Sequence, residues 1–348
     1  MRRLSQATFT QRRCQSRAVT KSHSSESVAD HATYFPMITR RVFSSTLLLT
    51  VLPGARILTA TAANEGTAGT AAAAGAAPKV TPPATRKLPM RVNLNGFGGA
   101  NESDIKAVLR SAADEIWQHC PNTRFGDAGF EIFHRDKTPI TNHERSREGG
   151  IVVGLAAEGY MWSRYAYQFA HEFCHALISH SNDWRRLWRK TEHANQWLDE
   201  ALCETASLFS LRAMARTWKT NPPFRNWKSY APSLASYAQA RMDDPKHRLP
   251  AGTRFADWFA AELPGLRKAW SQRDKNTLIA QQLLPLFEAQ PQGWESLTTL
   301  KLGSRDVDKS LAKHLAEWQA NAPAEQRAFV GKIAAVFGVT AAAGKGAE

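Results

Sequence analysis

The chain has 348 residues, of which 43% are hydrophobic, and a formal net charge of +14. This length allows one large domain or two modest ones, with a full core that needs no disulfide support. Residues 1–63 hold nine of the 45 basic and two of the 31 acidic residues, which leaves 36 basic against 29 acidic residues, or about +7. Because no nucleic-acid-binding motif accompanies this charge, we expect a mildly basic soluble protein that binds no nucleic acid.

Residues 37–62 have the three-part form of an export signal. A basic start precedes a short apolar run, and Ala60-Thr61-Ala62 supplies an A-x-A-type cleavage site. The pair Arg40-Arg41 resembles the twin-arginine export motif. The apolar run is too short and too interrupted to cross a membrane. The sequence therefore predicts an exported, periplasmic or extracellular protein with a cleaved signal and no stable membrane span; a buried or anchoring helix is the alternative.

The segments that flank this signal are not expected to contribute to a core. Met37 directly precedes the signal, so residues 1–36 are interpreted as an upstream mis-start or a disordered extension. Residues 63–87 are rich in Ala, Gly, Thr and Pro, which is typical of a flexible linker. Residues 339–348 are expected to be a disordered tail. The folded domain is therefore assigned to residues 88–338.

The first half of this domain mixes predicted strands and helices. Alternating and apolar runs that end in glycine predict strands within 88–99, 129–136 and 149–159. Apolar positions that recur at helical spacing predict helices over 101–120, 160–180 and 195–217. The second half shows helical patterns near 228–242, 252–262, 275–288, 308–319 and 324–337. This layout predicts an α+β fold, with a small mixed sheet, two site-bearing helices, an all-helical C-terminal half and a cleft between the halves.

The stretch HEFCH, residues 171–175, places two histidines one turn apart on a predicted helix. The rings of His171 and His175 can therefore reach one metal ion, and Glu172 can reach a water molecule beside it. The opposite face is apolar and would anchor the helix in the core; it consists of Phe169, Phe173, Cys174, Leu177 and Ile178.

Catalytic zinc needs a third protein ligand. His180 does not fit the HExxHxxGxxH arrangement, and Glu192 and His193 lie in a polar loop where we expect them to be solvated. Glu200 lies on the next predicted helix, 25 residues after His175, and Glu204 follows one turn later on the same face. Glu200 is therefore the preferred ligand, and Glu204 would accept the free ring N–H of a histidine ligand.

These residues resemble the gluzincin metallopeptidases, which carry HExxH on one helix and a glutamate ligand on the next. WLDEALCE (197–204) is similar to the WLxEGxA segment of the aminopeptidase branch, with Ala201 in place of its glycine. The resemblance covers about residues 167–207. It implies a zincin-like domain in which His171, His175 and Glu200 bind Zn²⁺ and Glu172 is the general base.

The resemblance also implies a Tyr or His that donates to the oxyanion, for which Tyr230, Tyr237 and His247 are candidates. The strand within 149–159 is expected to pair with an extended peptide substrate, although Gly149 and Gly150 are also typical of a turn.

Cysteines and tryptophans near the motif allow two interpretations each. Cys174 and Cys203 lie on the two helices that would meet at the metal, where they form either a disulfide or two buried thiols. The tryptophans line a substrate groove or fill the core; they are Trp162, Trp184, Trp188, Trp197, Trp218 and Trp227.

The sequence as a whole predicts an exported zinc metallohydrolase, a peptidase whose partner is a peptide or protein substrate. The alternative is a non-catalytic envelope protein with a structural or degenerate metal site that binds protein partners. Hydrolysis that depends on Glu172 would distinguish the two.

Overall fold

The computed structural model describes residues 86–181, 185, 187 and 192–339. The chain divides into two units, Met1–Pro78 and Lys79–Glu348, and only the second contains described residues. The predicted extension and export signal lie outside the described residues. So do the predicted linker, apart from its last two residues, and the predicted tail, apart from Val339.

A four-stranded mixed sheet forms one layer of the domain. Its strands are β1 (Met90–Val92), β2 (Phe130–His134), β3 (Ile140–Arg145) and β4 (Ile151–Leu155), in the order β1-β2-β4-β3. β2 pairs in parallel with β1 and β4, whereas β3 pairs antiparallel with β4. The strands expected within 88–99, 129–136 and 149–159 are thereby confirmed, and β3 is an additional strand that the sequence analysis did not predict.

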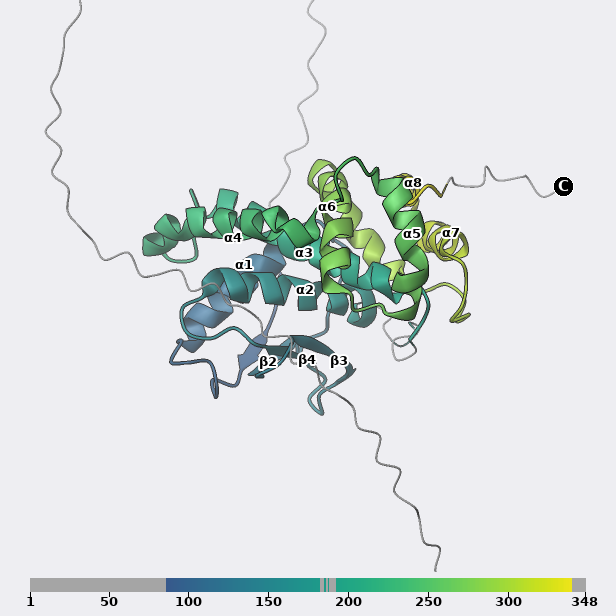
Figure 1. Cartoon of the computed structure of the whole chain (residues 1–348). Coiled ribbons are helices and arrows are strands. Elements are labelled where there is room, and N and C mark those ends of the chain that lie inside the picture. The colour runs from purple at the N-terminus through teal and green to yellow at the C-terminus, as the bar shows by residue number, and fades with distance from the viewer. Residues whose placement is uncertain (1–85, 182–184, 186, 188–191, 340–348) are drawn as a thin grey trace, which may run out of the picture. The chain divides into compact units, whose positions relative to one another are not determined.

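The helices α1 (Glu102–Trp117) and α2 (Trp162–His180) pack on the sheet, and α3 (Gln196–Thr217) packs on both of these helices. α2 lies between the sheet and the other helices, as Figure 1 shows. Its expected apolar face is buried, with the side chains of Phe169, Phe173 and Leu177 fully inaccessible to solvent. The rings of Phe169 and Phe173 pack on that of Phe130 of β2, with centroids 5.6 and 5.8 Å away. This aromatic contact fixes α2 on the sheet and orients its opposite face toward α3.

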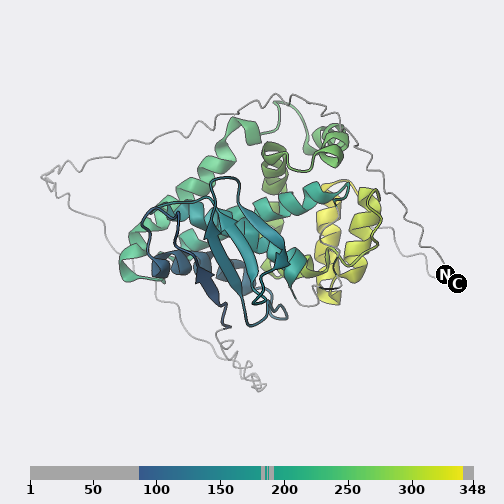
Figure 2. The same ribbon diagram turned by 90° about the horizontal axis from the view of Figure 1, so that it is seen from below.

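The second half of the domain is helical, as predicted. It contains α4 (Ala231–Asp243), α5 (Phe255–Lys268), α6 (Arg273–Ala289), α7 (Leu311–Asn321), α8 (Arg327–Val336) and the short 3-10 helices η2 (Arg225–Tyr230), η3 (Pro245–His247), η4 (Pro291–Thr299) and η5 (Ala324–Gln326). Figure 2, seen from below, places the sheet in front of the helices and α7 and α8 to one side. The small mixed sheet and the excess of helix confirm the α+β fold class. No helix in the described part of the chain is long and apolar enough to cross a membrane.

The tryptophans near the motif mostly fill the core and do not line a groove. Trp162, Trp197 and Trp218 are buried. Trp227 is partly buried, and its ring lies 5.3 Å from that of Trp162 and 5.4 Å from that of Trp218. For the buried three, the core alternative is therefore confirmed and the groove alternative is wrong. Trp184 and Trp188 lie outside the described residues.

Candidate metal centre

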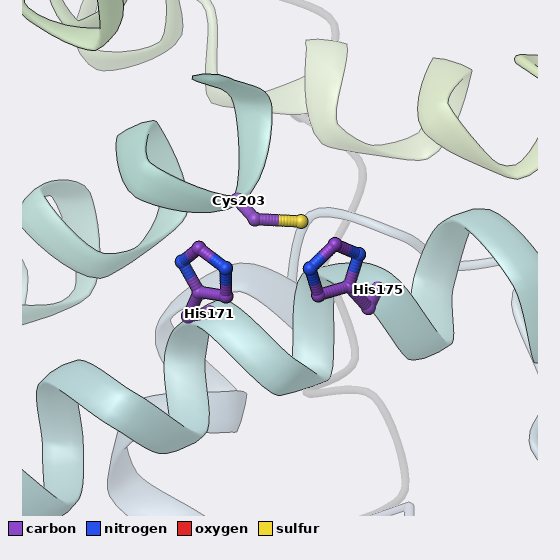
Figure 3. Close-up of side chains that lie close together, drawn as sticks. All are labelled: His171, His175 and Cys203. Carbon is purple, nitrogen blue, oxygen red and sulfur yellow. The ribbon is translucent and has the colours of Figure 1, made fainter. Parts of the chain in front are cut away.

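His171 and His175 project from the same face of α2, with their ring centroids 5.0 Å apart (Figure 3). Their side chains are 19% and 24% exposed, whereas most of α2 is buried. The helical spacing of HEFCH therefore produces two neighbouring imidazoles at a surface that solvent can reach.

Glu200 of α3 lies against both rings. One carboxylate oxygen is 3.4 Å from Nε2 of His171, and the other is 3.4 Å from Nε2 of His175. These distances are long for a charge-assisted hydrogen bond, which is about 2.7–2.9 Å. They match the separation of roughly 3.3 Å between two ligands of a tetrahedral zinc ion with bonds of about 2.0–2.1 Å. Each ring therefore lies at ligand spacing from a different oxygen of the Glu200 carboxylate.

Cys203, one turn after Glu200 on α3, adds a fourth donor. Its Sγ and one ring nitrogen each of His171 and His175 all lie within 4.8 Å of one another, a group that could hold a metal ion. Figure 3 shows the sulfur pointing from α3 toward the space between the two rings. The sequence pattern predicts Cys203 only as half of a disulfide or as a buried thiol, although its position three residues after Glu200 places it on the same helix face.

Cys174 and Cys203 are both buried and both free, so the disulfide alternative is wrong and the thiol alternative is confirmed. Burial raises the pKa of the Cys203 thiol well above its usual value. Without a cation beside it this side chain therefore stays a neutral thiol, and binding a metal through sulfur would release a proton.

Glu204 is buried behind His171. One carboxylate oxygen lies 3.6 Å from Nδ1 of His171. The other accepts hydrogen bonds from Tyr167 and, at 2.9 Å, from Thr277, and lies 3.7 Å from Arg241. Burial alone would raise the pKa of Glu204, but His171 and Arg241 outweigh it and lower the pKa to about 2. This position fits the expected role of an acceptor for the ring N–H of a histidine ligand.

The carboxylates also determine the charge of His171. Burial lowers the pKa of His171, yet the carboxylates of Glu200 and Glu204 reverse this effect and bring the pKa well above its ordinary value. Burial likewise raises the pKa of Glu200, but His175 and His171 bring it below its usual range. Without a metal ion the two carboxylates therefore stabilise a protonated His171, and an ion that binds through this ring would displace its proton.

Glu172 is 2% exposed and faces the sheet side of α2. The hydroxyl of Thr141 in β3 lies 2.8 Å from a carboxylate oxygen of Glu172 and 2.9 Å from its backbone carbonyl oxygen. A hydroxyl that donates to the carboxylate holds this side chain in one orientation beside the histidine face of α2.

The rejected ligands occupy other places. Nε2 of His180 lies 2.8 Å from the carbonyl oxygen of Asn142, and Glu192 is exposed as expected. The expectation that His193 is solvated is wrong, because it is buried, with Nε2 3.9 Å from a carboxylate oxygen of Asp199. His193 and Asn195 are buried beside the C-terminal helices, which their polar character does not indicate.

The three candidates for an oxyanion donor are held differently. The Tyr230 hydroxyl is the acceptor for the backbone N–H of Ser163 at the start of α2, and Nε2 of His247 lies 3.3 Å from Asp274. Tyr237 is half-buried, and its ring packs edge-on against Tyr167 at 5.7 Å. Within the described part of the chain its hydroxyl makes no hydrogen bond, which distinguishes it from the other two.

The expected pairing of a peptide with the strand in 149–159 is wrong. β4 is hydrogen-bonded to β2 on one side and to β3 on the other, so neither edge is free. Gly149 has a φ of 86° and its N–H donates to the carbonyl of Ser146, so it serves the turn that precedes β4. The edge strand beside the histidine face is β3.

A surface hollow of about 200 Å³ lies between α3 and α4 and contains none of the metal-site residues; Arg212, Arg216 and Met242 are among its lining. The metal group itself sits where α2 and α3 face each other. No protein-family model, curated protein or solved structure matches the chain.

Proposed function

We propose that the protein is a zinc-dependent metallohydrolase that cleaves peptide bonds. The observation that supports this proposal is the convergence of His171, His175 and Cys203 from two helices, with a different oxygen of the Glu200 carboxylate 3.4 Å from each histidine ring. Imidazole, carboxylate and thiolate are the donors that zinc accepts in proteins. The export signal predicted in residues 37–62 would direct this activity to the periplasm or the outside of the cell.

Bound zinc would supply two effects, a lower pKa of water and a polarised scissile carbonyl. Glu172 follows His171 directly, so its carboxylate would accept the proton of the attacking water and deliver it to the leaving amine. The hydroxyl of Thr141, which donates to this carboxylate, would hold it in one orientation for the proton transfer.

The number of protein ligands separates this proposal from its alternative. With His171, His175 and Glu200 as ligands, a fourth position stays open for water, as catalysis requires. With Cys203 added, the ion would have four protein ligands and the site would be closed, which is typical of structural zinc. The proximity of Cys203 thus favours the second candidate, a non-catalytic metal site in a protein that binds partners.

Substrate binding would involve β3, the edge strand nearest the histidines among the described residues. An extended peptide that pairs with this edge gains main-chain hydrogen bonds regardless of its sequence. This arrangement suits a peptide or protein substrate better than a compact small molecule.

The metal content of the purified chain tests the ligand set. We expect about one zinc per chain by elemental analysis, lost in Glu200→Ala and kept in Cys203→Ser. If zinc is instead lost in Cys203→Ser, or if the wild type binds none even after incubation with zinc, the open-site proposal is wrong.

Hydrolysis of a mixed peptide pool tests the role of Glu172. Glu172→Gln keeps the shape of the side chain but cannot accept the proton, so we expect unchanged zinc content and a rate reduced by at least about 10²-fold. Full activity in this variant would exclude Glu172 as the base. If the wild type binds zinc without any hydrolysis, the structural alternative is favoured.

A further inference from the structure

Exposed apolar side chains gather where α2 begins and where η2 leads into α4. Six large hydrophobic side chains are exposed among the described residues, and three of them are here: Tyr160, Met161 and Phe224, at 67%, 44% and 38%. The Tyr160 ring packs on that of Trp162 at 5.7 Å, and the Phe224 ring packs on that of Trp227 at 4.9 Å. The rings of Trp162 and Trp227 stack at 5.3 Å. Two segments that are far apart in the sequence therefore form one apolar surface.

Unpaired positive charge surrounds this apolar surface. Residues 205–242 contain six basic and no acidic residues. Three of the six, Lys219, Arg225 and Lys228, each come directly after an aromatic residue whose ring packs in this cluster. All three are exposed, and none makes an ion pair within the part of the chain that the structure describes. The ring contacts therefore hold these three cations around the apolar side chains.

Two acidic side chains near this surface are directed to other partners. Glu288 of α6 lies 2.7 Å from Arg212, which lines the hollow between α3 and α4 together with Lys219. Glu158 lies 3.3 Å from Nε2 of His134 in β2. Neither carboxylate pairs with the three exposed cations, so the surface keeps a net positive charge. We call it the aromatic–basic patch; it consists of Tyr160, Met161, Lys219, Phe224, Arg225 and Lys228.

Charge disfavours two occupants that the protein itself could supply. Residues 1–63 hold nine basic and two acidic residues, so they would be repelled by the patch. A second copy that docks through the same patch in a symmetric dimer would bring like charges together. The charge of the patch therefore favours a separate, anionic occupant.

The exposed apolar side chains indicate which anionic occupant fits best. Aromatic side chains are enriched at the headgroup level of lipid bilayers, where one end of the ring is in contact with the acyl chains. Each Lys or Arg close to an anionic bilayer strengthens binding by about fivefold. A purely acidic peptide would pair with the cations but would leave Met161 and Phe224 in water. A lipid surface uses both parts of the patch.

We infer that the aromatic–basic patch docks the protein on a membrane surface that contains anionic phospholipids. The exposed rings and Met161 would enter the headgroup region, and the three cations would pair with lipid phosphates. The inference does not depend on the proposed hydrolase, because the patch contains no residue of the metal centre.

Hydrogen–deuterium exchange of the full chain tests the inference, because it reports binding at the patch separately from binding by the basic residues 1–63. With vesicles of about 30% phosphatidylglycerol in phosphatidylcholine, we expect exchange in segments 158–164 and 216–230 to slow by about tenfold. Vesicles of phosphatidylcholine alone should give no protection. In the triple variant Lys219→Gln, Arg225→Gln, Lys228→Gln, the lipid concentration for half-maximal protection should rise by about 100-fold.

Two further variants separate the location of the charge and the role of the rings. The control Lys137→Gln, Lys268→Gln, Arg305→Gln removes three exposed cations elsewhere on the domain and should need about the same lipid concentration as the wild type. The variant Tyr160→Ser, Phe224→Ser keeps every cation but removes two exposed rings, and should need about tenfold more lipid.

Absence of protection with anionic vesicles would overturn the inference, as would protection that survives the triple variant or that is lost equally in the control. Unchanged lipid binding by the serine variant would also overturn it, because the patch would then bind anions by charge alone. A single-stranded oligonucleotide and polyglutamate serve as the other probes. If one of these protects the two segments and the vesicles do not, the patch binds a different anionic partner and the inference is wrong. None of these outcomes bears on the hydrolase proposal.

Discussion

Glu204 links the metal ligands to the rest of the molecule through one buried charge. Its low pKa, about 2, keeps the carboxylate ionised at neutral and mildly acidic pH. A permanent negative charge 3.6 Å from Nδ1 of His171 favours the tautomer with its proton on Nδ1, which leaves Nε2 free to bind a metal. Arg241 and Thr277 hold this carboxylate in place from two further helices.

Glu204→Gln should therefore weaken metal binding. The amide keeps the size of the side chain and can still accept from Tyr167, but the charge beside His171 is lost. We expect the zinc affinity to fall by about 10–100-fold, measured by competition with a chromophoric chelator. Glu288→Gln, which removes a carboxylate that pairs with Arg212 of α3, is the control and should leave the affinity unchanged. Equal zinc affinities in the wild type and both variants would mean that Glu204 contributes only to the packing of α3 against α4 and α6 and not to metal binding.

Part of this site can be predicted from the sequence because helical spacing is local. Two histidines four residues apart, and Glu200 and Glu204 four residues apart, must share a face of their helices. Cys203 could have been found by the same rule. Arg241 and Thr277 could not, because they follow Glu204 by 37 and 73 residues, and only tertiary packing brings them to it.

Among the elements that border the site, β3 has the weakest sequence signal. Its sequence, ITNHER, is polar, and its residues are exposed or half-buried. A strand at the edge of a sheet pairs on one side only and needs no continuous apolar face, so the usual alternation is missing. β2 and β4, which lie inside the sheet, are apolar and were predicted correctly.

Thr141→Val tests whether β3 takes part in the reaction. Valine has the shape of threonine without the hydroxyl, so the strand should persist while the Glu172 carboxylate loses its donor. A hydrogen bond to a charged group is worth about 1.5–3 kcal/mol, so we expect kcat to fall about tenfold or more with unchanged zinc content. Thr141→Ser, which restores the hydroxyl, should recover most of the rate. A valine variant as active as the wild type would show that Glu172 is oriented by other contacts.

At the scale of the whole molecule, a buried charged cluster joins the C-terminal helices to the start of α3. Asp199, next to Glu200, lies 2.8 Å from the Lys301 ammonium group and 3.9 Å from His193. The His193 ring in turn lies 5.6 Å from that of His314 in α7. The pattern of apolar residues predicts the helical second half, but it does not indicate that these polar residues lie beneath it. Their burial makes the position of α3, and so of Glu200, depend on the C-terminal helices.

This cluster makes the folded protein sensitive to mild acid. Burial lowers the pKa of His314 to about 3, and neither ring nitrogen has a hydrogen-bond partner within the described residues. In the unfolded chain the pKa is about 6.5, so between these values the unfolded state binds the proton and stability falls as the pH decreases. From pH 7 to pH 5 this effect amounts to about 2 kcal/mol.

His314→Leu should remove this part of the acid sensitivity, because leucine fills the buried space without a titrating group. We expect the free energy of unfolding in urea, measured at pH 7 and pH 5, to fall by about 2 kcal/mol more in the wild type than in the variant. Both proteins contain the same other titrating groups, including Glu317 and His193. The contributions of these groups to the pH dependence therefore largely cancel when the two losses of stability are compared. If both proteins lose the same stability on acidification, His314 takes up a proton as readily in the folded protein as in the unfolded chain. Burial beneath the C-terminal helices would then not lower its pKa.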